Sequence, residues 1–250
     1  MSRGAAAARP AFPPTRRWLG VVALALFVAS LLWPLSQAAD RYELWSLARY
    51  AVFALAIPPL VVLAAPWSRS EFVARLARRR ARHRELRRSG GFVLLYAAVL
   101  IWWFTPTAAD AVAGHGWLTV VEGLTLIPAG IALWLELLAS PPLVPRVGPL
   151  LRSVLAAGAM WLVWIEAYVV GLSHADWYPR FHHTAGHGLS AAADQQIAAV
   201  VLWFVATAVF VPAIFANALS WLRSEEDPDG ELYALMREER RRAWPSTGPT

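Results

Sequence analysis

The chain has 250 residues, of which 58% are hydrophobic and only 16% are charged. Soluble domains average about 45–50% apolar and about 25% charged residues, so this composition excludes an ordinary soluble domain and indicates a polytopic membrane protein. Cysteine is absent, which excludes disulfides, thiolate metal sites, iron–sulfur clusters and cysteine nucleophiles. All 23 basic residues are Arg, and with 17 acidic residues the net charge is +6. The distribution of the arginines indicates the orientation of the protein in a membrane rather than nucleic-acid binding.

The chain begins with an Ala- and Pro-rich head, residues 1–17, which we predict to be disordered and cytoplasmic. Apolar stretches follow that are each long enough for a membrane-spanning helix of about 20 residues. The six candidates lie near residues 18–36, 44–66, 91–109, 116–139, 150–172 and 195–222. None alternates polar and apolar residues with period two. The predicted fold is therefore all-α, a six-helix transmembrane domain over residues 18–222.

The first stretch has an alternative interpretation as a cleaved signal. Residues 15–20 resemble a twin-arginine signal, and Ser36-Gln37-Ala38 could precede a cleavage site. Cleavage would leave five spans and place the new N-terminus outside the cell. The apolar run exceeds a usual signal core of about 7–15 residues, and Trp18 and Trp33 lie at its two ends as interfacial residues do. These features favour a retained first span.

The Arg residues predict the orientation of the bundle. Twenty of them fall in segments on one side, nine of these between Arg69 and Arg88, whereas Arg41 and Arg180 fall on the other side. Because positive residues are enriched in cytoplasmic segments, both termini and the loop 68–89 are predicted to be cytoplasmic. The charged tail, residues 223–250, is expected to be cytoplasmic and to form a short helix from Asp229 to Arg242.

The Arg-rich loop between the second and third spans has an amphipathic pattern. Phe72, Val73, Leu76 and Leu86 roughly share one helical face, and arginines occupy the rest. The pattern predicts a surface helix that lies on anionic lipid headgroups. We expect no nucleic acid as a partner.

Five of the six histidines are predicted to lie outside the cell. Three of them, His182, His183 and His187, lie close together in the loop before the last span, with His174 upstream and Asp194 downstream. Imidazole and carboxylate groups suit copper or zinc, so these five residues are the candidate metal ligands and copper is the candidate cofactor. Such spacing also arises by chance in a loop, so solvated interfacial histidines are the alternative.

Ionisable side chains also occur inside the predicted spans. Counting about 1.5 Å per residue places Arg49, Glu122 and Glu166 some 8–9 Å below the outer surface. Charges at this depth need partners, so Arg49 is expected to pair with Glu122 or Glu166, with Tyr50 in the same polar layer. This layer either joins helices or forms a vestibule that receives a cation or a partner. Glu136 lies near the predicted cytoplasmic end, from which its side chain can extend to the interface.

Several short motifs resemble one known family. The Pro-Pro-Leu-Val-Val-Leu run that starts at Pro58 is similar to a stretch of the membrane-integral cytochrome c oxidase assembly factors, the CtaG family of caa-type oxidases. Asp194-Gln195-Gln196 resembles the signature that opens the last helix of that family. Smaller matches follow the same order between residues 45 and 224, at Trp103 to Pro106, Gly130 to Trp134, Ser140-Pro141-Pro142 and Trp177-Tyr178-Pro179.

The resemblance implies an assembly factor for a respiratory haem–copper oxidase that acts by binding on the outer face of a bacterial plasma membrane. Its partners would be oxidase subunits or other assembly factors. Because no nucleophile–base pair accompanies the intramembrane glutamates, we expect no enzyme activity.

This chain departs from the family at the intramembrane histidines that are the family's candidate metal residues. The corresponding positions are Ser46, Tyr50, Phe104 and Gly123. Ser, Phe and Gly cannot replace imidazole as copper ligands. Two interpretations stay open: copper is handled by the outer histidines, or the protein is a copper-independent scaffold in which the Arg49 charge lies where a cation would bind. A small transporter gated by the Arg/Glu layer is the remaining alternative.

Overall fold

The computed structural model describes residues 16–32, 34–82, 86–173, 177–178, 181, 190–226 and 236. The chain in these ranges folds into helices, which confirms the predicted all-α class. The α-helices are α1 (Arg17–Leu31), α2 (Leu35–Arg41), α3 (Glu43–Ala51), α4 (Ile57–Ala64), α5 (Glu71–Arg82), α6 (Leu86–Phe104), α7 (Pro106–Gly114), α8 (Gly116–Leu137), α9 (Pro149–Gly171) and α10 (Ala191–Glu226). A π-helical turn, η2 (Val52–Ala56), joins α3 to α4, and a 3₁₀ turn, η3 (Pro66–Arg69), follows α4.

Four continuous helical segments are long and apolar enough to cross a membrane: Glu43–Ser68, Gly116–Leu137, Pro149–Gly171 and Ala191–Arg223. The number rises to six if each of two bent helix pairs counts as one span. These pairs are α1 with α2, bent by 56°, and α6 with α7, bent by 65°.

The bends shorten two of the predicted helices. The helix expected over 18–36 ends at Leu31, and the one expected over 91–109 ends at Phe104. Pro106 explains the second break, because it has no N–H to continue α6 and instead occupies the first turn of α7. By contrast, α8 and α10 continue through Pro128 and Pro212.

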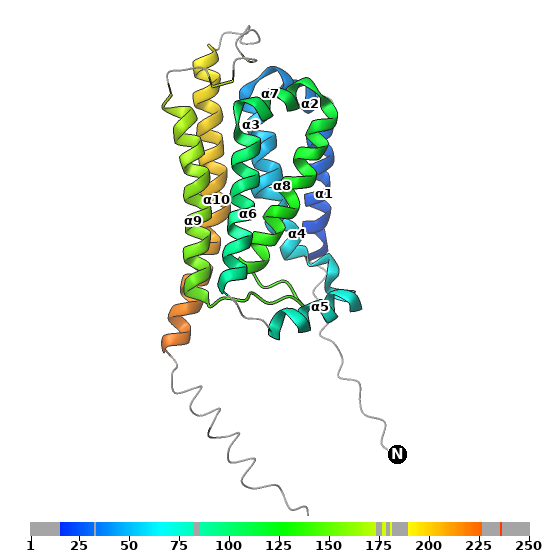
Figure 1. Cartoon of the computed structure of the whole chain (residues 1–250), viewed down its shortest axis with the longest axis vertical. Helices are drawn as coiled ribbons and strands as arrows, with labels where there is room; N and C mark the ends of the chain where they lie inside the picture. The colour runs from blue at the N-terminus through cyan, green and yellow to red at the C-terminus, as the bar shows by residue number, and fades with distance from the viewer. Residues whose placement is uncertain are drawn as a thin grey trace, which may run out of the picture.

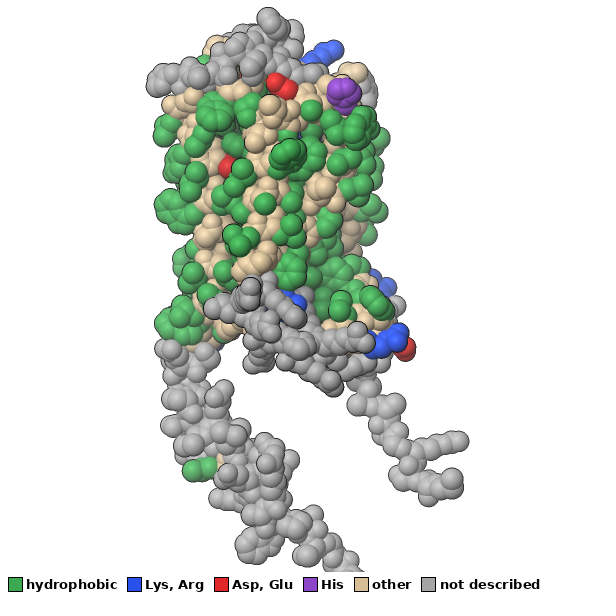
Figure 2. Space-filling view, in the orientation of Figure 1, with side chains coloured by type: hydrophobic (Ala, Val, Ile, Leu, Met, Phe, Trp, Pro, Cys, Tyr) green, Lys and Arg blue, Asp and Glu red, His purple; other side chains and the backbone are tan. Residues whose placement is uncertain are grey.

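Figure 1 shows α9 and α10 side by side at one edge of the bundle, α1 and α4 toward the other, and α3, α6 and α8 between them. The short helices α2 and α7 lie at the end where α3, α8 and α10 begin, which we call the α2/α7 end. At the opposite end α1 begins, α10 ends and α5 lies across the bundle. Apolar side chains dominate the surface between the two ends (Figure 2), as a lipid-facing bundle requires.

The paired prolines of α4 are accommodated by a local change in the helix. Pro58 has no N–H to donate to the carbonyl of Ala54, and the preceding turn widens to a π-helix over Val52–Ala56. The Tyr96 hydroxyl of α6 donates to that carbonyl at 3.3 Å. A neighbouring helix thus satisfies the backbone group that the proline leaves open, as the membrane interior demands.

The Arg-rich loop forms the predicted surface helix as α5, in which Phe72 is 68% and Leu76 is 48% exposed. Leu86 does not share their face, because it begins α6. The helix predicted over 229–242 lies outside the described residues except for Met236, and the predicted head is described only from Arg16.

Candidate functional site

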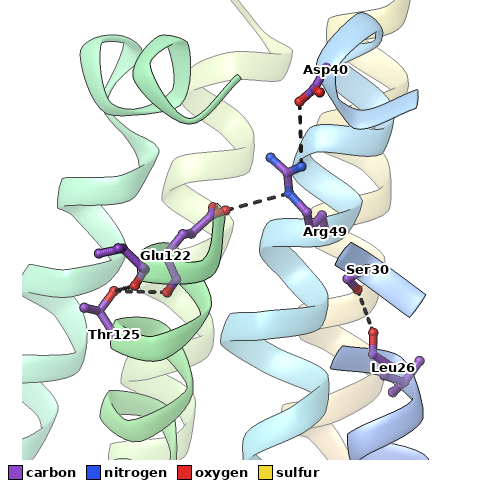
Figure 3. A network of polar contacts seen from close by, with 7 residues as sticks. Leu26, Ser30, Asp40, Arg49, Glu122 and Thr125 are labelled. Atoms are coloured by element: carbon purple, nitrogen blue, oxygen red, sulfur yellow. Dashed lines mark hydrogen bonds and ion pairs between the residues drawn. The ribbon is translucent and has the colours of Figure 1, made fainter. Parts of the chain in front are cut away.

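The predicted polar layer contains an ion-paired arginine at the α2/α7 end of the bundle. Arg49 of α3 lies with its Nε 3.7 Å from Oε2 of Glu122 on α8. Its Nη1 lies 4.0 Å from Oδ1 of Asp40 on α2 (Figure 3). The Arg49 and Glu122 side chains are 4% and 7% exposed, whereas Asp40 is 43% exposed. Arg49 thus links three helices, with one buried and one accessible carboxylate.

Sequence reasoning missed Asp40, which falls in the joint between two predicted spans. The available signal was that Asp40 lies shortly before Arg49 in the sequence, close to the predicted membrane surface. A buried guanidinium commonly recruits any carboxylate within reach of its five donors.

Glu166 makes a separate contact in the same layer, through the residue after Arg49. The Tyr50 hydroxyl lies 3.1 Å from Oε2 of Glu166 on α9 and 3.1 Å from the Leu100 carbonyl on α6. Tyr50 is 3% exposed and Glu166 is 6% exposed. Of the two partners expected for Arg49, Glu122 forms the ion pair and Glu166 contacts Tyr50. The layer therefore consists of two adjacent sets of polar contacts, one at Arg49 and one at Tyr50, that connect α3 with α2, α8, α9 and α6.

A small pocket lies beside these contacts. Its volume is about 20 Å³, enough for one water-sized group, since a buried water needs about 10–15 Å³. Its polar walls come from Glu43, Ser46, Tyr50, Glu122 and Tyr178. Ser46 and Tyr50, which the resemblance places where the family has histidines, therefore face a cavity with very little free space.

Aromatic rings occupy the surroundings of the pocket. The Phe104 ring, at another of the histidine positions, lies 6.0 Å from the Tyr50 ring and 6.3 Å from the Tyr178 ring, centroid to centroid. The Tyr178 hydroxyl donates to the Phe104 carbonyl at 2.9 Å. Burial, together with nearby Glu43, raises the pKa of Tyr178 above its ordinary value, which keeps the phenol neutral as a donor.

The remaining histidine position has no room for a ring. Gly123 lies on α8, where an added Cβ would be 3.1 Å from Cε2 of Phe27 and 3.4 Å from Cε2 of Phe53. These two rings pack against each other with centroids 5.7 Å apart. Any side chain at residue 123 would therefore require at least the Phe27 ring to shift.

The signature at the start of α10 makes a structural joint. Asp194 is 5% exposed, and its carboxylate accepts hydrogen bonds from the backbone N–H groups of Glu43 at 2.8 Å and Leu44 at 3.3 Å. It therefore caps the N-terminus of α3, where a negative charge is stabilised. Gln195 accepts from the Trp177 N–H at 3.0 Å and donates to the Val170 carbonyl at 2.8 Å, which ties α10 to the end of α9.

The other predicted metal ligands, His174, His182, His183 and His187, lie outside the described residues. Within the described residues, no group of three or more His, Cys, Asp or Glu side chains is arranged to hold a metal ion. Asp194 uses both of its oxygens for the cap of α3.

Glu136 forms a second polar cluster, at the other end of the bundle. The expectation that it reaches the interface is wrong, because Glu136 is fully buried. Its Oε1 accepts from Nη1 of Arg146 at 2.9 Å, and its Oε2 accepts from the Ser89 hydroxyl at 2.9 Å. The Arg146 guanidinium also lies 5.3 Å from the centre of the Phe92 ring. The arginine of the following loop folds back over the carboxylate, so Glu136 is paired inside the protein.

Comparison with known protein families agrees with this arrangement of motifs. The sequence model of the cytochrome c oxidase caa3 assembly factor family (Caa3_CtaG) matches residues 2–224. Comparison with curated proteins and with solved structures gives no match. The family match covers most of the chain, including both polar clusters and the joint at Asp194. The chain therefore belongs to the cytochrome c oxidase caa3 assembly factor family.

Proposed function

We propose that this protein assists oxidase assembly as a copper-independent scaffold, and that it binds oxidase subunits or other assembly factors at the outer face of a bacterial plasma membrane. The observation that carries the proposal is the occupation of the polar layer by the protein's own groups. Glu122 is already paired with Arg49, and Glu166 is in contact with Tyr50. A copper ion would find a neighbouring fixed positive charge and no imidazole among these residues.

The α2/α7 end has the features of a docking surface. The short helices α2 and α7 lie at this end (Figure 1), and the accessible carboxylate of Asp40 on α2 is within ion-pair distance of the buried Arg49 (Figure 3). A basic side chain of a partner could pair with Asp40 without opening the bundle. Binding of this kind needs no turnover and no bound metal.

A small transporter fits the structure less well than a scaffold. Transport through the bundle requires polar groups that continue from the Arg49 layer toward Glu136. The core residues between them include Leu126, Leu133 and Trp134, which are 0–1% exposed. Trp134 also stacks on Phe210 with ring centroids 5.2 Å apart. The described core between the two polar clusters is therefore apolar and closely packed.

We further propose that α5 lies on the anionic cytoplasmic leaflet. The exposed Phe72 and Leu76 are one helical turn apart and can enter the interface. Arg75, between them in sequence, is exposed in a loop rich in arginine. Each arginine near an anionic membrane surface contributes about 1 kcal/mol to the free energy of binding to that surface.

A gene deletion complemented with variants tests the scaffold proposal. We expect the deletion strain to lose oxidase activity, and a variant with His182, His183 and His187 all changed to Ala to restore activity and oxidase copper as fully as the wild type. The purified wild-type protein, titrated with Cu(I) and Cu(II), should bind neither stoichiometrically.

A second variant, Asp40→Arg, tests the docking surface. It reverses the charge of the accessible carboxylate and should complement poorly while remaining folded. Failure of the triple histidine variant, together with copper binding by the wild type that this variant loses, would establish the outer histidines as a copper site and refute the scaffold. Normal oxidase activity in the deletion strain would refute the assembly role itself.

A further inference from the structure

A groove runs along the surface of the bundle between the halves of α9 and α10 that lie nearer the α2/α7 end. It encloses about 320 Å³ and is lined by Tyr168 and Gly171 of α9 and by Gln196, Ala199, Val200 and Trp203 of α10, among others. It is separate from the polar layer, whose residues face the inside of the bundle. Tyr168 is 46% and Val200 is 62% exposed, so the groove is open to the surrounding membrane.

The base of the groove is formed by small residues where the two helices meet. A Cβ added at Gly171 would lie 3.0 Å from Cβ of Ala199, which shows how closely α9 and α10 approach beneath it.

The lining of the groove is mostly apolar, and the side chains in it that carry polar atoms are Gln196, Tyr168 and Trp203. Gln196 lies at its end nearest the start of α10, and Trp203 lies seven residues further along, which is about 10 Å at 1.5 Å per residue. Gln196 is exposed and its amide makes no hydrogen bond with any described residue, whereas the adjacent Gln195 is buried and bonded through both amide atoms. One glutamine of the signature therefore serves the fold, and the other faces the membrane at the groove entrance.

We propose that this groove binds one glycerophospholipid from the leaflet that meets the start of α10. The Gln196 amide donates to an ester carbonyl of the lipid, and one acyl chain lies over Gly171 and Ala199 as far as Trp203. A lipid satisfies an amide at the edge of the hydrocarbon region, where an unpaired polar group is unfavourable. The Gln196 amide at one end and the largely apolar lining beyond it match the ester region and the acyl chain of such a lipid.

The test measures phospholipid that stays bound to full-length protein. The protein is purified from membranes that contain phosphatidylethanolamine, exchanged through lipid-free detergent, and examined by native mass spectrometry. We expect one phospholipid per wild-type chain. Val200→Trp, which fills the groove, should lose it, and Gln196→Leu should lower its affinity roughly fivefold, the effect of losing one ordinary hydrogen bond.

Ile197→Trp is the matched control, because Ile197 is 40% exposed and does not line the groove. This variant should retain the lipid as the wild type does. Thermal unfolding should be unchanged in both Trp variants, since neither position is buried. The proposal is overturned if the wild type retains no phospholipid, or if Val200→Trp and Ile197→Trp retain it equally.

Discussion

At the scale of single residues, the energetics of the polar layer depend on Arg49. Its guanidinium is 4% exposed and lies within ion-pair distance of carboxylates on two other helices. Moving such charges out of water is costly, and their mutual attraction offsets that cost only while both members are present. We therefore expect that removing one member of the Arg49–Glu122 pair lowers the stability of the protein more than removing both.

Replacing Arg49 with Met should lower the free energy of unfolding by about 3–5 kcal/mol, because Glu122 is left buried without its cation. Denaturant-induced unfolding in detergent micelles measures this change. The double variant Arg49→Met/Glu122→Leu should recover most of the loss, since it removes both charges. Arg75→Met, at an exposed position on α5, is the control and should change stability by less than about 0.5 kcal/mol. A double variant as unstable as Arg49→Met alone would show that the pair is not coupled.

Some of the buried polar contacts could be predicted from sequence and others could not. Depth counting along the spans brought Arg49 and Glu122 to one level, because helical rise is uniform. It could not assign Asp194 to the N-terminus of α3, since the donor Glu43 is 151 residues away in the chain. Nor could it predict that Glu136 would be covered by Arg146, because that depends on how the loop after α8 folds back.

At the scale of helices, α4 and α8 pack in very close contact. A Cβ added at Gly130 of α8 would lie 2.5 Å from Cγ and 2.8 Å from Cβ of Pro58. The proline ring is rigid and belongs to the Pro-Pro pair, so it cannot turn away as a flexible side chain would. The family resemblance at both Pro58 and Gly130 thus coincides with one steric contact between two helices.

Gly130→Ala should therefore destabilise the protein by about 1–3 kcal/mol, the usual cost of overpacking a core. Gly158→Ala is the matched control, because an added Cβ there meets nothing within 4 Å. In the middle of α9 this control should be neutral or stabilising by up to about 1 kcal/mol. Thermal unfolding of the two variants under identical detergent conditions makes the comparison. Equal stability of the two would mean that α4 and α8 can separate without cost.

Hydropathy predicted where helices occur better than where they change direction. The segments near 116–139 and 150–172 agree with α8 and α9 within a few residues. The bends of 56° and 65° were missed, because a hydropathy window measures composition and not the direction of the chain. Pro106 marked one break, but Pro128 and Pro212 have the same chemistry and interrupt nothing, so proline alone does not decide the outcome.

At the scale of the whole molecule, the two ends of the bundle differ in charge and in chemistry. The end that carries α5 also contains the start of α1 and the end of α10, as an even number of crossings requires (Figure 1). The arginines of the loop 68–89 belong to this end, and the buried Arg49 layer lies toward the other. If arginine marks the cytoplasm, the polar layer and the proposed docking surface lie on the outside.

Single-cysteine labelling tests this orientation directly, because the natural chain has no cysteine and each introduced thiol is unique. We expect a membrane-impermeant maleimide to label Ser190→Cys in intact cells, since the exposed Ser190 lies just before α10. Glu71→Cys on α5 and Arg16→Cys before α1 should react only after the membrane is permeabilised. The reverse pattern would place the Arg49 layer on the cytoplasmic side and remove the basis for docking at the outer face. Labelling of Arg16→Cys together with Ser190→Cys in intact cells would instead show that the start of α1 lies outside, and that the chain crosses the membrane an odd number of times.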